Sequence, residues 1–430
     1  MGENADLPAE DIRDAYKPRL IDNKVKRLLS IHGGVLITGP KWCGKSWTGM
    51  MHSKSAISMA NDVSRRLAQL DPQSALSGER PRLIDEWQEL PGLWDSARLK
   101  IDASRKKGLF LFTGSYLPSD KATAHSGAGR FALLKMRTMS LFEYGYSNGA
   151  VSLSGLFDGK AFETTYSSLN YSKAVRLICR GGWPDAMQMS DEDSVEIPKA
   201  YLEILYDHDS SRVDGRKRSP EKMKKIVMSI ARNTATCATL RSIASDMAGK
   251  GGRGPSENTV ADYLGALKRL FLLEEQSGWS PNLRSATRMR SSPKRHLTDP
   301  SLAAAAICNG PGELERDPNT AGLLFESLCY RDLCIYVADL GGEVCYYSDN
   351  SGLEVDFVIQ LKDGRWGAIE AKMGTSEFEK ATRNLNRLRD KMVSGGLREP
   401  SFLMILNVTG QIAIRREDGI IEAPIDCLGP

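Results

Sequence analysis

Eight consecutive residues fit the pattern G-x-x-x-x-G-K-[ST], in which a glycine-rich loop closes around phosphate groups. The predicted nucleotide-binding residues are these eight and the one that follows: Gly39, Pro40, Lys41, Trp42, Cys43, Gly44, Lys45, Ser46 and Trp47. Backbone N–H groups of such a loop, and the N-terminus of the helix after it, attract phosphate oxygens. We expect Lys45 to neutralise the β- and γ-phosphates and Ser46 to bind Mg²⁺. The motif therefore predicts a site for ATP and Mg²⁺.

Two further apolar runs end in polar residues that suit the same chemistry. Residues 82–86 end in Asp85 and Glu86, and residues 109–115 end in Thr113, Gly114 and Ser115. Asp85 would hold the Mg²⁺, Glu86 would accept a proton from the attacking water, and a hydroxyl such as that of Ser115 would position that water. The alternative is a glycine-rich turn with a chance acidic pair. Motif, context and chain order together favour a P-loop ATPase.

A second group of candidate residues lies near the C-terminus. Asp356 stands in one apolar run, and Glu370 and Lys372 end the next. Alternation places Glu370 and Lys372 on one face of a strand, and Glu326 on an amphipathic stretch can supply a third carboxylate. Glu326, Asp356 and Glu370 are thus candidate ligands of Mg²⁺, with Lys372 stabilising charge on a phosphate. The alternative is a solvent-facing acidic pair with a salt-bridging lysine.

The elements that must position these residues can be read from the hydrophobic pattern. Apolar strands at 33–38, 82–86 and 109–115, with a helix beginning near Lys45, predict a parallel sheet covered by helices over residues 16–150. Residues 151–215 show no strand alternation, so a helical lid is expected. Residues 216–300 show helical stripes around a glycine-rich turn, the pattern of a winged-helix module. Residues 301–430 mix helical and strand-like runs, which predicts a separate α/β domain.

Positive charge is concentrated on both sides of the proposed winged helix. The flanks hold Arg212, Arg216, Lys217, Arg218, Lys222, Lys224 and Lys225 before it, and Arg284, Arg288, Arg290, Lys294 and Arg295 after it. Such flanks favour a phosphate backbone, so double-stranded DNA is a candidate partner. A solvated linker and a domain-packing module explain the same charges.

Composition limits the remaining choices. A chain of 430 residues is expected to form about three domains, and its net charge of +4 does not by itself indicate a polyanion partner. The eight cysteines include no CxxC pair, which favours free thiols in a reducing compartment. No apolar stretch is long enough to cross a bilayer. We therefore expect a cytoplasmic protein with no membrane partner.

Several segments resemble a known family. The chain resembles bacterial and archaeal AAA-type ATPases that carry a C-terminal domain of unknown function. The segments that carry the resemblance are GPKWCGKSW, PRLIDEWQELPGLWD, LFLFTGSYLP and MRTMSLFEYG. The resemblance implies a recurring Gly-Arg element at Gly129 and Arg130, with Arg130 as an arginine finger in cis or in trans, or else a surface arginine. It also implies that residues 181–184, GGWP, match an element of the helical lid that packs near adenine, although a turn before a helix would look the same.

The C-terminal runs LLFESL, SGLEVDFVI and AIEAK resemble the restriction-endonuclease-like PD-(D/E)xK fold. The whole chain is thus expected to be an α/β protein with an AAA-type sheet, a helical lid, a winged-helix module and a nuclease-like domain. Two hypotheses follow. One is an ATPase coupled to metal-dependent DNA cleavage. The other is an ATP-dependent switch with a catalytically inactive nuclease-like domain. A second copy of the chain, in a homo-oligomer, is a further candidate partner.

Overall fold

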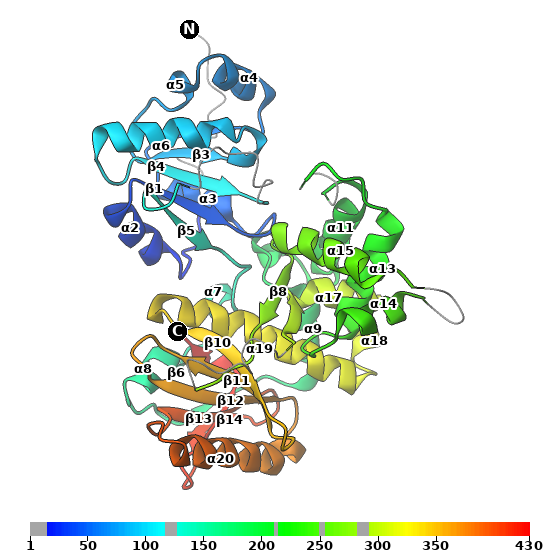
Figure 1. Ribbon diagram of the computed structural model, residues 1–430. Helices are drawn as coiled ribbons and strands as arrows, with labels where there is room; N and C mark the ends of the chain where they lie inside the picture. Colours follow the sequence, from blue (N-terminus) through cyan, green and yellow to red (C-terminus); the bar gives the residue numbers. More distant parts are fainter. Residues whose placement is uncertain (1–14, 117–126, 210–213, 249–253, 282–291) are drawn as a thin grey trace. The chain divides into compact units, whose positions relative to one another are not determined.

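The computed structural model describes residues 15–116, 127–209, 214–248, 254–281 and 292–430 (Figure 1). The described chain divides into two compact units. The first takes its residues from 1–138, 208–217 and 266–272, and the second from 139–207, 218–265 and 273–430. Several predicted features lie outside the described residues: Arg212, Arg284, Arg288, Arg290 and most of the glycine-rich turn near residue 250.

The first unit is built on a five-stranded sheet in the order β2-β3-β4-β1-β5, in which every pairing is parallel. Its strands are β1 (Gly34–Thr38), β2 (Ser55–Ser58), β3 (Arg82–Asp85), β4 (Phe110–Gly114) and β5 (Phe131–Lys135). The predicted strands at 33–38, 82–86 and 109–115 are confirmed, because β1, β3 and β4 fall within them. Strands β2 and β5 were not predicted from the sequence.

Helices cover both faces of this sheet (Figure 1). They are α2 (Asp22–Ile31), α3 (Lys45–Met51), α4 (Asp62–Leu70), α5 (Pro72–Ala75) and α6 (Gly92–Ser104), with a 3₁₀ turn, η1, at Trp87–Glu89. Alternate residues of β1 enter different cores. Leu36 packs in the cluster with α6, whereas Val35 and Ile37 pack in the cluster with α2. Burial on both faces explains why β1 is a continuous apolar run.

The second unit contains a seven-stranded mixed sheet in the order β10-β11-β12-β13-β15-β14-β7. Its strands are β7 (Thr165–Tyr166), β10 (Glu343–Ser348), β11 (Glu354–Gln360), β12 (Trp366–Lys372), β13 (Phe402–Asn407), β14 (Ile412–Arg415) and β15 (Ile421–Pro424). The long helices α19 (Pro318–Leu340) and α20 (Phe378–Ser394) run on opposite sides of it (Figure 1). This is an α/β arrangement, as the sequence predicts for residues 301–430.

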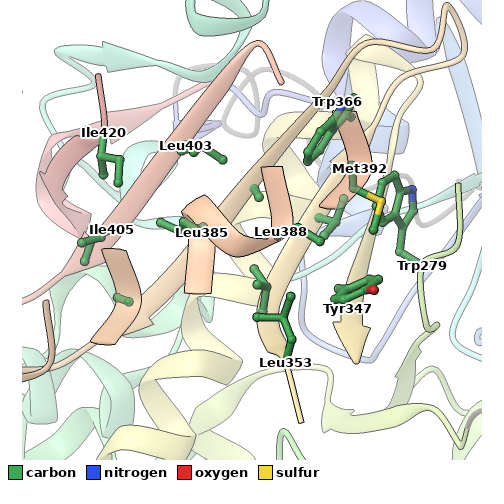
Figure 2. Packing of buried hydrophobic residues seen from close by; sticks show 14 of the residues in the cluster. Trp279, Tyr347, Leu353, Trp366, Leu385, Leu388, Met392, Leu403, Ile405 and Ile420 are labelled. Atoms are coloured by element: carbon green, nitrogen blue, oxygen red, sulfur yellow. The ribbon is translucent and has the colours of Figure 1, made fainter. Parts of the chain in front are cut away.

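The apolar side of α20 packs in one hydrophobic core cluster of this unit (Figure 2). Leu385, Leu388 and Met392 of the helix belong to the same buried cluster as Trp366 of β12, and Met392 lies nearest to it. The Trp279 ring stacks on that of Trp366 with their centroids 5.4 Å apart. Burying side chains of this size contributes about 1.5–3 kcal/mol each, so this cluster holds β12 and its polar C-terminal end firmly in place.

Residues 151–215 differ from the predicted all-helical segment. The helices α8 (Leu153–Phe157), α9 (Tyr171–Arg180), α10 (Asp191–Ser194) and α11 (Glu196–Ile204) are present. Strand β7, however, pairs with β14, and β6 (Val151–Ser152) pairs with β16 (Leu428–Gly429). Two-residue strands carry no alternation to detect, and their partners lie far along the chain. The segment GGWP is buried in the same unit, where Gly182 donates to the Asp299 carboxylate at 3.0 Å.

In the described parts of residues 218–297 there are three helices and one pair of antiparallel strands. The helices are α13 (Pro220–Arg232), α14 (Leu240–Ala248) and α15 (Glu257–Arg269). The second unit includes α13, α14 and the part of α15 up to Gly265. Strands β8 (Leu273–Gln276) and β9 (Lys294–Leu297) pair antiparallel. Then follow α17 (Pro300–Ile307) and α18 (Pro311–Leu314). The short α7 (Leu141–Tyr144) begins with a capping box formed by Ser140 and Glu143.

Candidate functional site

The predicted phosphate-binding loop connects β1 to α3, the strand–loop–helix context that its motif requires. Gly39 is needed because a Cβ at this position would lie 2.2 Å from the Met136 carbonyl oxygen. Gly44 immediately precedes α3 with φ 99°, and Trp42 also has a positive φ of 62°. Side chains other than glycine rarely adopt such φ values. The loop conformation is therefore specified by its glycines and by the strand beside it.

The two lysines of the loop make different contacts. The buried Lys45 side chain donates a 2.6 Å hydrogen bond to the Pro40 carbonyl oxygen, so its ammonium group folds back over the loop. Lys41 forms an ion pair of 2.7 Å with Asp209. Only Lys45 thus lies where the loop closes on a phosphate. Trp42 and Trp47 are about two-fifths exposed, whereas the Cys43 side chain is buried and faces the protein interior.

The Asp85 carboxylate accepts hydrogen bonds from hydroxyl groups of three elements. Ser46 at the start of α3 donates to its Oδ1 at 2.8 Å, Thr113 of β4 donates to the same oxygen, and Ser58 of β2 donates to Oδ2 at 3.2 Å. The carboxyl ends of parallel strands meet at one edge, which brings these residues together. Ser46 and Asp85 present hard oxygen donors of the kind that Mg²⁺ prefers. The residues therefore fit the predicted Mg²⁺ of a bound nucleotide.

Glu86 stands beside Asp85 in a left-handed conformation, with φ 51° and ψ 45°. Its backbone N–H donates to the Thr113 hydroxyl at 3.3 Å, and its carboxylate accepts hydrogen bonds from Ser115 at 2.9 Å and from Gln88. A non-glycine residue in this region is uncommon, and its cost must be offset by the surrounding contacts. The side chain is thereby fixed at the edge of the sheet next to the phosphate-binding loop.

The structure joins the predicted residues Ser46, Asp85, Glu86 and Ser115 in one hydrogen-bonded group. Sequence reasoning missed Ser58 and Gln88, which bind the two carboxylates. Ser58 ends a strand too polar to be recognised. Gln88 lies two residues after Glu86, and the turn η1 brings its amide back to that carboxylate. A turn of this kind leaves no sequence signal apart from the spacing.

Arg130 lies away from this group. Its carbonyl oxygen accepts a hydrogen bond from Gly34, so it adjoins the beginning of β1 and precedes β5, whereas the phosphate-binding loop follows the end of β1. Five strand residues span about 16 Å. The Arg130 side chain instead pairs with Asp102 at 2.8 Å, and this pairing lowers the pKa of Asp102. This placement favours action in trans over action in cis, and the role of Arg130 as an arginine finger stays a prediction.

The C-terminal candidates also come together. Lys372 Nζ lies 3.0 Å from Asp356 Oδ2 and 2.6 Å from Glu370 Oε2. Asp356 accepts a further hydrogen bond of 2.9 Å from the Ala371 backbone, and Glu370 accepts one of 3.0 Å from Asn384 of α20. Adjacent strands β11 and β12 place the two carboxylates at one end of the sheet. The expected solvent-facing alternative is excluded, because both acids are buried.

A second lysine enters this cluster from the strand β9. Lys294 Nζ lies 2.9 Å from Glu326, 2.9 Å from Glu354 and 3.8 Å from Asp356. Sequence reasoning missed this role of Lys294 and assigned it to a basic flank. Nothing in the local pattern KRHL distinguishes a buried lysine from an exposed one. Only the pairing of β9 with β8 brings it to these acids.

Burial and charge shift the pKa values of this cluster in opposite directions. Burial, reinforced by the charge of Asp356, raises the pKa of both Glu326 and Glu370 to about 8. Burial also raises the pKa of Asp356, but the charges of Lys372 and Lys294 outweigh it and hold that pKa below its usual range. The two lysines stay protonated because the carboxylates outweigh their own burial. Protons and ammonium groups thus already balance the acids near neutral pH.

The predicted magnesium ligands Glu326, Asp356 and Glu370 do not fit Mg²⁺ as they are arranged. Mg²⁺ requires oxygen ligands at about 2.0–2.1 Å in octahedral geometry, whereas Lys294 and Lys372 lie between these carboxylates. Across the described residues, no three His, Cys, Asp or Glu side chains are grouped as metal ligands.

The structure also changes the predicted basic flanks. Arg218 is buried against Asp262, and Arg295 is buried with Glu275 close by at 3.4 Å. With Lys294 they are unavailable to a nucleic acid in this structure. Of the flanking basic residues that the structure describes, those that stay exposed are Arg216, Lys217, Lys222, Lys224 and Lys225. In the described ranges no helix is both long enough and apolar enough to span a membrane, and the eight cysteines, all within them, form no disulfide.

Three known families match successive parts of the chain. Residues 32–145 match a family described as an AAA domain. Residues 172–313 and 321–428 match two domains of unknown function, DUF8612 and DUF4143. The first match agrees with the parallel sheet, the loop and the acids Asp85 and Glu86. Residues 32–145 therefore form a domain that resembles AAA domains and carries a P-loop motif.

Known proteins resemble longer parts of the chain. Uncharacterized proteins of Mycobacterium tuberculosis (Rv2008c) and Mycobacterium bovis are 25% identical over 370 residues, which cover 84% of this chain and 75% of theirs. A Walker-type ATPase of Pyrococcus abyssi covers 68% of this chain and 97% of its own, with 14% identity and a TM-score of 0.43. RuvB of Thermotoga maritima covers 60% of this chain and 88% of its own, with 17% identity and a TM-score of 0.28. These scores do not establish a shared overall fold.

Proposed function

We propose that this chain binds ATP with Mg²⁺ at the loop of residues 39–46 and hydrolyses it. The observation that carries the proposal is the hydrogen-bonded group in which Ser46 and Thr113 meet Asp85, while Ser115 holds Glu86 beside it. Mg²⁺, when bound, would neutralise charge on the phosphates. Backbone N–H groups of the loop and Lys45 bind the phosphate oxygens, which requires Lys45 to leave the Pro40 carbonyl.

Glu86 is the proposed general base. Its carboxylate is fixed by Ser115 and Gln88 at the carboxyl edge of the sheet, and it would accept a proton from the water that attacks a bound terminal phosphate. Asp85 holds the Mg²⁺ side of the site through Ser46. Binding and turnover therefore depend on different residues, and substitution can separate them.

The test compares two variants with a matched control. Lys45→Ala should abolish ATP binding, measured with a fluorescent nucleotide, and therefore turnover. Glu86→Gln should keep binding and lower the hydrolysis rate by about 10²–10⁴-fold. Lys107→Ala removes an exposed lysine at the other edge of the sheet and should change neither. Normal hydrolysis by Glu86→Gln would refute the assignment of the base.

We further propose that the remaining modules bind rather than cleave nucleic acid. Among the described residues, helices α13, α14 and α15 precede the strand pair β8–β9, an order that fits a winged helix, and the exposed basic residues in and before α13 suit a phosphate backbone. Binding of a labelled duplex should weaken with salt, and Lys222→Glu with Lys224→Glu should weaken it further. Plasmid incubated with Mg²⁺ or Mn²⁺, with and without ATP, should stay intact. Nicking that Lys372→Ala abolishes would show instead that the nuclease-like domain cleaves.

A further inference from the structure

The carboxylate cluster of the second unit consists of Glu326, Glu354, Asp356 and Glu370, and it already contains two cations. Lys372 lies between Asp356 and Glu370, and Lys294 lies among Glu326, Glu354 and Asp356. The Lys294 side chain is only 3% exposed. A buried ammonium group needs several acceptors to offset its lost hydration, and this lysine has them.

The backbone around Lys294 is fixed on two sides. Its cross-strand partner in β8 is Gln276, whose side-chain amide donates a 2.8 Å hydrogen bond to the Asp356 carbonyl oxygen. Two residues along β9, the buried His296 ring lies 2.7 Å from the Ser327 hydroxyl, and Ser327 adjoins Glu326 on α19. Strands β8 and β9 are thus hydrogen-bonded to the Asp356 backbone and to Ser327, the residue next to Glu326. Lys294 therefore enters the cluster because strand pairing places it there.

We propose that Lys294 is a built-in cation that takes the place of a divalent metal ion in this cluster. The ammonium nitrogen fills the space into which Glu326, Glu354 and Asp356 converge, and it supplies the positive charge that these acids require. A metal ion at bonding distance from the same oxygens would overlap it. The resting chain therefore has no divalent-cation site here, and Lys294 closes the position. This inference is independent of ATP hydrolysis.

Mn²⁺ binding to the full chain without nucleotide tests this proposal by electron paramagnetic resonance. Wild type and Glu326→Gln should bind the same number of Mn²⁺ ions, because any weak binding near Asp85 is common to both. Lys294→Met preserves the length of the side chain and removes its charge. We expect it to bind one additional Mn²⁺ and to show a Tm that rises with Mn²⁺ concentration.

Adding Asp356→Asn to Lys294→Met should remove both the additional ion and the rise in Tm. The proposal is overturned if wild type binds one more Mn²⁺ than Glu326→Gln does, a comparison that does not require the Lys294 variant to fold. It is also overturned if folded Lys294→Met, verified by circular dichroism, gains no Mn²⁺. Equal Mn²⁺ counts for wild type and Glu326→Gln, with a gain in Lys294→Met, support it.

Discussion

The Ser46 hydroxyl donates a 2.8 Å hydrogen bond to Asp85 Oδ1, joining the first turn of α3 to the end of β3. The two residues are 39 positions apart in the chain. This contact aligns the two donors proposed to hold Mg²⁺ before any nucleotide is bound. It also gives the carboxylate a partner that does not depend on the metal ion.

Asp85→Asn should impair the use of Mg²⁺ more than the binding of ATP. The amide keeps hydrogen bonds to Ser46 and Thr113 but loses the negative charge that attracts the ion. We expect the Mg²⁺ concentration for half-maximal hydrolysis to rise by about tenfold or more, as for a loss of about 1.4 kcal/mol. Mg²⁺ titrations of the ATPase rate measure this. Ser58→Ala, which keeps the carboxylate, is the control, and an unchanged Mg²⁺ requirement in Asp85→Asn would contradict the assignment.

Arg130→Ala should lower ATP turnover only where chains assemble. Arg130 precedes β5 and lies away from the loop of its own chain. A finger acting in trans contributes about 10³–10⁵-fold in comparable sites. The solution mass of the protein measured with ATP should therefore predict whether Arg130→Ala lowers turnover. In an assembly, mixing Arg130→Ala with Glu86→Gln should restore activity, because each variant supplies the residue that the other lacks.

The control for Arg130 is Asp102→Asn, which removes the partner and keeps the arginine. It should leave turnover unchanged, since a solvent-exposed ion pair contributes little to stability. If the chain is a monomer and Arg130→Ala still lowers its ATP turnover strongly, Arg130 must act on the site of its own chain, which would contradict this prediction.

Gly39→Ala should destabilise the first unit. The added Cβ would lie 2.2 Å from the Met136 carbonyl oxygen, and neither backbone segment can yield without disturbing β1 or the chain after β5. Overpacking of this kind costs about 1–3 kcal/mol. Urea unfolding measures the loss. Gly92→Ala is the matched control, because a Cβ there meets nothing within 4 Å. Equal stabilities of the two variants would be inconsistent with the close contact.

Stability should fall below pH 6.5 because of His296. Its burial, together with the charge of Lys294, lowers the pKa of His296 from 6.5 to about 3. Between these values the unfolded chain binds a proton that the folded chain does not, so acid favours unfolding. The free energy of unfolding should drop by about 1.4 kcal/mol per pH unit for this one proton.

The measurement is urea unfolding of wild type and His296→Gln at pH 7.5, 6.5 and 5.5. The amide cannot titrate, so the difference between the two proteins should shrink below pH 6.5. A difference that stays constant over this range would mean that His296 is protonated in the folded chain.

Much of the first unit could be predicted because its signals are local. Residues 39–46 specify a loop between strand and helix, and Asp85, Glu86 and Ser115 end strands that are apolar enough to recognise. Strand β2 lacked that signal, because Ser55 and Ser58 make it polar. Strand β5 begins with four apolar residues, 131–134, but this run was not recognised as a strand. The location of Arg130 could not be predicted without β5.

The sequence alone determined the phosphate-binding loop, the acids that follow β3 and the strands that carry Asp356 and Glu370, because each depends on residues that are close together in the chain. Tertiary structure decided which partners these residues meet. The sequence does not distinguish Lys294 from the other basic residues near it. The pairing of β9 with β8 buries it among Glu326, Glu354 and Asp356. The reason is physical: the residue type does not say how deeply a lysine is buried or which oxygens surround it, and these decide whether it is free to bind a phosphate or fills a carboxylate cluster.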